Sequence, residues 1–130
     1  MLYLDSSAVV KLVKSEPETP ALLELLRSRP DVISSALAHV EVTRAVRRLK
    51  HPGDIEQRVV ATLMRVALVP IDAEVLTRAA DVPPPEIRSL DAIHLATALL
   101  LRDDVDGFVT YDRKLAAAAR AAEIPVLVPA

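Results

Sequence analysis

LDAIHLATALLL, residues 90–101, is an almost wholly apolar stretch that carries one acid, Asp91, near its start. The preceding Ser89 is a suitable N-cap, so the stretch predicts a helix that begins there. Unpaired N–H groups and the helix dipole favour a negative charge in the first turn of a helix. Other acids stand at comparable places along the chain, and together they indicate a reaction site.

Short apolar segments alternate with helical segments on both sides of this stretch. The predicted strands are residues 1–5, 31–34, 67–71, 108–111 and 126–128. The other predicted helices are 6–14, 20–29, 36–50, 55–66, 73–80 and 112–122. The expected N-caps of the helices between the first and the last are Thr19, Ser34 or Ser35, Asp54 and Asp72. Strand–helix alternation implies right-handed crossovers and a parallel sheet covered on both faces, so we predict an α/β fold.

The length and composition favour one domain over residues 1–130. At 52% hydrophobic residues, the chain can bury a substantial core. It has no cysteine, which excludes disulfides, thiolate zinc sites and thiol nucleophiles and fits a cytoplasmic location. The N-terminal MLYLD has no basic leader, and no apolar run approaches the roughly 20 residues that span a bilayer. We therefore expect no membrane association.

The net charge of −2 argues at first against a nucleic-acid partner. If four of the 18 acids form one metal site, however, the remaining 14 acids face 16 lysines and arginines, and the rest of the surface carries +2. That balance is compatible with RNA. The only aromatic residues are Tyr3, Phe108 and Tyr111, so base stacking on rings cannot be the main mode of binding.

Four acids occupy places where a parallel sheet has its functional sites, outside the carboxyl ends of the strands. Asp5 and Asp112 fall at the carboxyl ends of predicted strands, and Glu41 and Asp91 lie on helices that can lean over the same edge. Each acid also has a simpler interpretation. Asp5 and Asp112 can be N-caps, Asp91 can be a partner of the helix dipole, and Glu41 can pair with Arg44 three residues on.

A cluster of four carboxylates would need a counter-charge. Two carboxylates about 5 Å apart repel by roughly 3 kcal/mol at an effective dielectric near 20. Four would rival the whole stability of a domain, about 5–15 kcal/mol, so the cluster must take up protons or divalent cations. Carboxylate oxygens suit Mg²⁺ or Mn²⁺, which activate water for in-line attack on a phosphodiester. The acids therefore predict metal-dependent hydrolysis at phosphorus.

Four segments resemble, in order, those of the PIN-domain nucleases, and most closely the VapC-type toxins of toxin–antitoxin pairs. They are LYLDSSAVVKL (2–12), VEVTRA (40–45), LDAIHLATAL (90–99) and FVTYD (108–112). The resemblance implies a three-layer α/β/α fold with a central, mainly parallel sheet of about five strands. It also implies a homodimeric, Mg²⁺- or Mn²⁺-dependent endoribonuclease acting on structured RNA such as tRNA or rRNA. A cognate VapB-type antitoxin would cover the cleft with its C-terminal segment.

The resemblance assigns roles residue by residue. The acids of the metal site and of catalysis map onto Asp5, Glu41, Asp91 and Asp112. The small hydroxyl residues that orient carboxylates or water in the family map onto Ser6 and Thr110.

Basic side chains near the acidic segments are candidates for RNA contact. They are Lys11, Arg44, Arg88 and Arg113. Arg44 belongs to a basic stretch on the predicted helix that carries Glu41, together with Arg47, Arg48 and Lys50. The alternative for these side chains is a solvated helix face without a ligand.

His94 follows Asp91 by three positions and so can share its side of the helix. It is either a ligand or base of the site or a packed, hydrogen-bonded histidine, and we favour the second interpretation. His39 and His51 lack a partner spacing such as HExxH, so the sequence does not support zinc hydrolase chemistry.

Two other protein classes fit the sequence less well. A signalling receiver domain has a similar sheet but needs a lysine after its fifth strand, and here the last strand ends in LVPA. A phosphatase of the haloacid dehalogenase type needs a second Asp two residues after the first, and position 7 is Ser. Within the PIN family, a housekeeping nuclease and an RNA-binding scaffold without catalysis stay open as alternatives.

Overall fold

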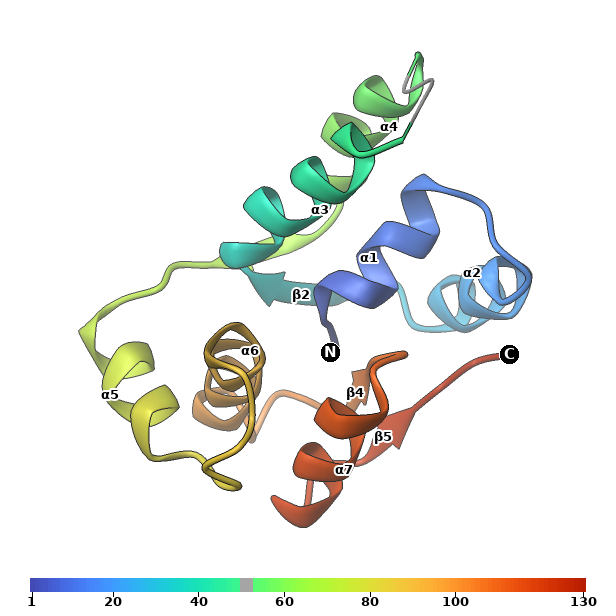
Figure 1. The fold of residues 1–130 in the computed structure, drawn as a ribbon. Helices are drawn as coiled ribbons and strands as arrows, with labels where there is room; N and C mark the ends of the chain where they lie inside the picture. Colours follow the sequence, from blue (N-terminus) through green and yellow to red (C-terminus); the bar gives the residue numbers. More distant parts are fainter. Residues whose placement is uncertain (50–52) are drawn as a thin grey trace.

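Five short strands form one sheet in which every neighbouring pair is parallel (Figure 1). The computed structural model describes residues 1–49 and 53–130. In these ranges the strands are β1 (Leu2–Leu4), β2 (Val32–Ser35), β3 (Ala67–Val69), β4 (Gly107–Val109) and β5 (Val126–Leu127). Their order across the sheet is β3-β2-β1-β4-β5, so β1 is central. The predicted parallel α/β sheet is confirmed.

Helices connect the strands and cover both faces of the sheet (Figure 1). They are α1 (Ser6–Val13), α2 (Thr19–Ser28), α3 (Leu37–Arg47), α4 (Ile55–Leu63), α5 (Ala73–Asp81), α6 (Ser89–Leu100) and α7 (Arg113–Ala121). Helices α1 to α4 pack on one face, α6 and α7 pack on the other, and α5 lies against α6. The layers are therefore helix, sheet, helix. Across the described ranges, no helix has the length and apolar character needed to cross a membrane.

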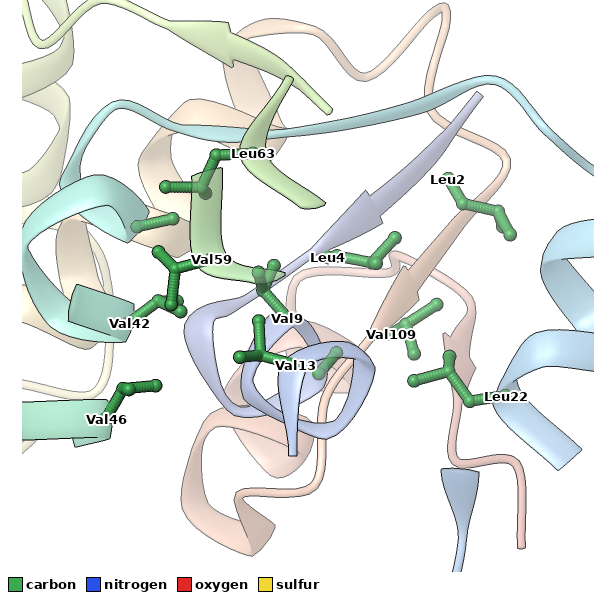
Figure 2. Packing of buried hydrophobic residues seen from close by; sticks show 12 residues of the cluster. Leu2, Leu4, Val9, Val13, Leu22, Val42, Val46, Val59, Leu63 and Val109 are labelled. Carbon is green, nitrogen blue, oxygen red and sulfur yellow. The ribbon is translucent and has the colours of Figure 1, made fainter. Parts of the chain in front are cut away.

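The central strand β1 contributes to the core of both layers, because its side chains alternate between the two faces of the sheet. Leu2 and Leu4 pack with α1, α3 and α4 in one apolar cluster (Figure 2). Tyr3 belongs to the opposite cluster, where its ring stacks on Phe108 with the centroids 5.0 Å apart. Leu95 of α6 is fully buried in the same cluster. The residues next to Asp5 are thus held from both sides.

The strand order decides which chain segments meet at the carboxyl edge of the sheet. The chain passes from β1 to β2 on one side and returns through β4 on the other, so the order reverses between β1 and β4. Such a reversal is where α/β sheets form their sites. Leu4 and Val109 are register partners, which brings the segments after β1 and β4 side by side. Helix α6 runs back before β4, so its first turn lies at the same edge.

Among the predicted helix caps, Asp72 and Asp112 are confirmed. Asp72 caps α5 and Asp112 caps α7, each carboxylate accepting from the N–H three residues on, at 2.9 and 2.8 Å. Neither serine proposed for α3 is its N-cap, which is Ala36; the Ser35 hydroxyl still accepts from the Leu37 N–H at 3.1 Å. Asp54 stands at the N-cap position of α4 without a side-chain cap hydrogen bond.

Two predicted N-caps, Thr19 and Ser89, are wrong by one residue, because each is the first residue of its helix. Thr19 is buried and serves the preceding loop instead. Its hydroxyl accepts from the Glu16 N–H at 2.9 Å and donates to the Lys11 carbonyl at 2.8 Å. This long-range use of the hydroxyl outweighs the local capping preference.

Some predicted ends also shift. Strand β3 stops at Val69 rather than at residue 71, because Pro70 has no N–H to donate to a ladder. Helix α3 ends at Arg47. The predicted helix end at Lys50 and the predicted break at residues 51–52 lie outside the described residues.

Replacing Leu95 by alanine should lower the free energy of unfolding by about 2–5 kcal/mol, because it opens a cavity at a fully buried position. Leu90→Ala on the same helix is the matched control, since Leu90 is 47% exposed and should cost less than about 0.5 kcal/mol. Urea denaturation followed by circular dichroism measures both. Equal effects of the two substitutions would contradict the packing of α6 described above.

Candidate active site

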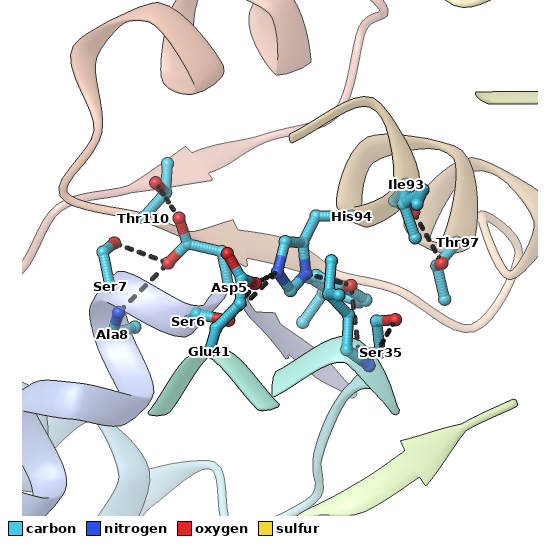
Figure 3. Close-up of polar contacts among 12 residues, drawn as sticks. Asp5, Ser6, Ser7, Ala8, Ser35, Glu41, Ile93, His94, Thr97 and Thr110 are labelled. Carbon is cyan, nitrogen blue, oxygen red and sulfur yellow. Dashed lines mark hydrogen bonds and ion pairs between the residues drawn. The ribbon is translucent and has the colours of Figure 1, made fainter. Parts of the chain in front are cut away.

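Asp5 follows the central strand β1 and has a buried carboxylate, 3% exposed. Its Oδ1 accepts from the Ser7 hydroxyl at 2.6 Å and from the Ala8 N–H at 3.0 Å, and its Oδ2 accepts from the Thr110 hydroxyl at 2.6 Å (Figure 3). Burial raises the pKa of Asp5, and these three hydrogen bonds partly offset the rise. Asp5 is therefore the N-cap of α1, and its carboxylate is held at the carboxyl end of β1.

Thr110 joins two of the acids. Its hydroxyl donates to Asp5 and also accepts from the Asp112 N–H at 3.1 Å. The carboxylate of Asp112 caps α7 through Oδ1, which accepts from the Leu115 N–H. Thr110 orients a carboxylate, as the resemblance implies. The Ser7 hydroxyl likewise donates a hydrogen bond to the Asp5 carboxylate. This role of Ser7 was not predicted, because the sequence shows only a hydroxyl residue two positions after the acid.

Glu41 lies on α3 with its side chain 25% exposed. Its Oε1 accepts from the Ser6 hydroxyl at 2.6 Å and lies 2.7 Å from His94 Nε2 (Figure 3). Burial alone would raise the pKa of Glu41, but the hydrogen bonds from His94 and Ser6 outweigh it and hold the pKa below its ordinary value. Glu41 thus takes these partners rather than Arg44, and it is kept ionised.

Asp91 lies in the first turn of α6 and is half-buried. Burial raises its pKa, and the negative charge of Asp112 raises it further. His94 lowers the pKa in part, while the charges of Asp5 and Glu41 add to the rise. The charges of the other three acids therefore act on Asp91, as expected if their segments lie toward the same edge of the sheet.

The donor set suits a hard divalent cation, because it consists of carboxylate oxygens whose mutual repulsion a cation would relieve. The side chains are not arranged as a finished coordination shell. Among residues 1–49 and 53–130, no three His, Cys, Asp or Glu side chains converge closely enough to hold one ion. Both oxygens of Asp5 and one of Glu41 already accept hydrogen bonds. Binding an ion would therefore require the side chains to turn toward one another.

His94 is a packed, hydrogen-bonded histidine, in agreement with the interpretation favoured from the sequence. It is 1% exposed, and its two ring nitrogens lie 2.7 Å from Tyr3 Oη and 2.7 Å from Glu41 Oε1. Tyr3 is a neighbour of the site that the sequence did not indicate, because it lies in an apolar strand with no polar pattern around it.

The basic candidates for RNA contact differ in their surroundings. Lys11 is engaged within the protein: its Nζ lies 3.3 Å from Glu16 and 3.0 Å from Glu18, and 4.6 Å from the centre of the Tyr111 ring. Contact with RNA would require Lys11 to leave these pairs. The other three candidates are exposed, namely Arg44, Arg88 and Arg113.

The chain is similar to known proteins along nearly its whole length. The family model described as PIN domain matches residues 2–121. Ribonuclease VapC46 of Mycobacterium tuberculosis is 43% identical over 129 residues, which cover 98% of this chain and 97% of that protein. Ribonuclease VapC35 of the same species is 41% identical over 133 residues, 99% of this chain and 97% of that protein.

A solved structure supports the fold independently. A toxin–antitoxin complex from Klebsiella pneumoniae contains a chain that matches with a TM-score of 0.75 and 22% identity, over 100% of this chain and 98% of that chain. At this identity the likeness concerns the fold alone. Sequence and fold similarity both extend over nearly the whole chain.

Asp91→Asn should raise the Tm of the metal-free protein by about 2–5 °C at neutral pH. Because the raised pKa means that the folded state binds the Asp91 proton more tightly than the unfolded chain, ionisation of Asp91 destabilises the fold as the pH rises through that pKa. The amide removes this cost, less a helix-dipole contribution of under about 1 kcal/mol. Differential scanning calorimetry in EDTA measures it. Asp103→Asn, at an exposed acid, is the control, and a lower Tm for Asp91→Asn would argue against clustering.

Proposed function

This chain belongs to the PIN-domain family, and on that basis we propose that it is a VapC-type toxin, an endoribonuclease that hydrolyses phosphodiester bonds in RNA with Mg²⁺ or Mn²⁺. One observation supports the proposal: the charges of Asp112, Asp5 and Glu41 all raise the pKa of Asp91, as expected for acids of separate segments near one edge of the sheet. The names of the relatives, ribonucleases at about 40% identity over nearly the whole chain, support it.

The alternatives within the family are less well supported. A scaffold that only binds RNA would have no use for neighbouring acids that raise the pKa of Asp91, because ionising Asp91 beside them costs stability. A housekeeping nuclease would fit the acids equally well. The relatives over the whole chain are VapC ribonucleases, which favours the toxin.

In the proposed mechanism Glu41, Asp91 and Asp5 hold the cation, with Asp112 as a fourth acid. A divalent cation bound by these acids would supply positive charge and an activated water for hydrolysis at phosphorus. The chain prepares the site by fixing its carboxylates. Ser7 and Thr110 hold Asp5. Hydrogen bonds to Glu41 Oε1 leave Oε2 as its available oxygen.

The substrate in this proposal is structured RNA such as tRNA or rRNA. Phosphate contacts fix a nucleic acid on a protein surface, and arginine is suited to them because its guanidinium binds phosphate through two parallel hydrogen bonds. Arg44, Arg88 and Arg113 are exposed and are the proposed contacts.

We further propose a cytoplasmic homodimer that a cognate VapB-type antitoxin neutralises. Two facts support a protein partner of this kind. The match to the two VapC ribonucleases covers 97% of each of those proteins. The Klebsiella pneumoniae structure of the same fold is titled a toxin–antitoxin complex. A cytoplasmic location places the enzyme with its RNA substrate.

Purified, antitoxin-free protein should cut total RNA into discrete fragments with Mg²⁺ or Mn²⁺, and EDTA should abolish the cleavage. Asp5→Asn should lower the rate by about 100-fold or more, because even residues that only support metal ligands change activity by 10–100-fold. Asp103→Asn is the matched control and should cut at the unchanged rate. Gel electrophoresis of the products measures all four reactions. Undiminished cleavage in EDTA would contradict the metal mechanism, and undiminished cleavage by Asp5→Asn would contradict the site.

A further inference from the structure

A directed chain of hydrogen bonds runs from the sheet to Glu41 through two buried side chains. The Ser35 N–H of β2 donates to Tyr3 Oη at 3.1 Å. Tyr3 Oη lies 2.7 Å from His94 Nδ1, and His94 Nε2 lies 2.7 Å from Glu41 Oε1. In Figure 3 the His94 ring lies between Glu41 and the Ser35 end of this chain. These hydrogen bonds connect β2, β1, α6 and α3.

With His94 as a neutral imidazole, the chemistry of the groups gives each proton one direction. A carboxylate only accepts hydrogen bonds, so His94 Nε2 must carry the proton that faces Glu41. A neutral imidazole then has a bare Nδ1, which accepts. Tyr3 Oη accepts from the Ser35 N–H and can donate its own proton to the bare His94 Nδ1. This tautomer satisfies both ends of the relay.

The surroundings keep this arrangement rigid. Tyr3 is 0% exposed and His94 is 1% exposed. The Tyr3 ring is held flat against Phe108, at an interplanar angle of 11°, and meets the His94 ring edge-on with the centroids 5.9 Å apart. A polar chain inside an apolar cluster is costly unless every member is paired. Here each polar atom of the chain has a partner.

We propose that Tyr3 and His94 are positioning residues for Glu41: their hydrogen-bond relay holds Oε1 and so presents Oε2 to the divalent cation. The relay itself stands on the geometry, and its purpose rests on the proposed function. Ser6 supports the same oxygen with its hydroxyl, at 2.6 Å. Groups that orient metal ligands in this way usually tune affinity for the ion.

The first test reads the tautomer of His94 directly. Long-range ¹H–¹⁵N NMR of metal-free protein with labelled histidine should show the Nε2–H tautomer for His94. Tyr3→Phe keeps the ring and removes only the hydroxyl, so it should change the His94 Nδ1 shift. An Nδ1–H tautomer or an imidazolium in the wild type would overturn the relay, as would an unchanged spectrum in Tyr3→Phe.

The second test measures what the relay does for metal binding. Tyr3→Phe should weaken Mn²⁺ binding about tenfold by isothermal titration calorimetry, although Tyr3 does not touch the carboxylate. Tyr111→Phe is the matched control: it also removes a hydroxyl hydrogen bond, from Tyr111 Oη to the Pro129 carbonyl at 2.8 Å, and should leave Mn²⁺ affinity unchanged.

A pair of His94 variants separates positioning from packing. His94→Gln keeps a donor and should retain Mn²⁺ binding better than His94→Leu, which fills similar space without one. Equal affinities of these two variants, or wild-type affinity in Tyr3→Phe, would overturn the positioning role. Wild-type protein that binds no Mn²⁺ would instead contradict the proposed function, and the tautomer spectrum would still decide whether the relay exists.

Discussion

Mutual repulsion among the carboxylates at the carboxyl edge of the sheet is the constraint on which the rest of the site depends. The effect of this repulsion is seen in the raised pKa of Asp91. After burial, the charge of Asp112 is the largest cause of the rise, and the charges of Asp5 and Glu41 act in the same direction. Carboxylates in such a set must take up protons or cations to persist. In the proposed mechanism a divalent cation would serve this purpose at neutral pH and would also supply the chemistry for hydrolysing RNA.

The fold meets this constraint by giving the acids different kinds of support. Asp5 is buried and held by hydroxyls from α1 and from the segment after β4, whereas Glu41 is held by α1 and α6. These elements meet because β1 lies between β2 and β4. The acids are therefore far apart in sequence but share one edge, and the apolar clusters on both faces of β1 keep that edge in place.

Local patterns predicted the succession of strands and helices along the chain and the helix caps at Asp72 and Asp112, because these features depend on neighbouring residues. The alternation of strands and helices in turn predicted the layers. The common edge of the four acids followed from the geometry of parallel sheets. Tertiary hydrogen bonds had no such signature. Thr19 serves a loop instead of its helix, and the contact of Tyr3 with His94 joins residues 91 positions apart, so neither follows from the sequence pattern.

The central claim is that these acids share one cation site, and a crystal structure of the protein grown with Mn²⁺ tests it most directly. The account predicts an anomalous difference peak at the carboxyl edge of the sheet, within coordination distance of Glu41 Oε2 and of Asp91, with Asp5 or Asp112 completing the protein ligands. A Mn²⁺ peak that touches only one of these acids, or none of them at a concentration that supports RNA cleavage, would contradict it.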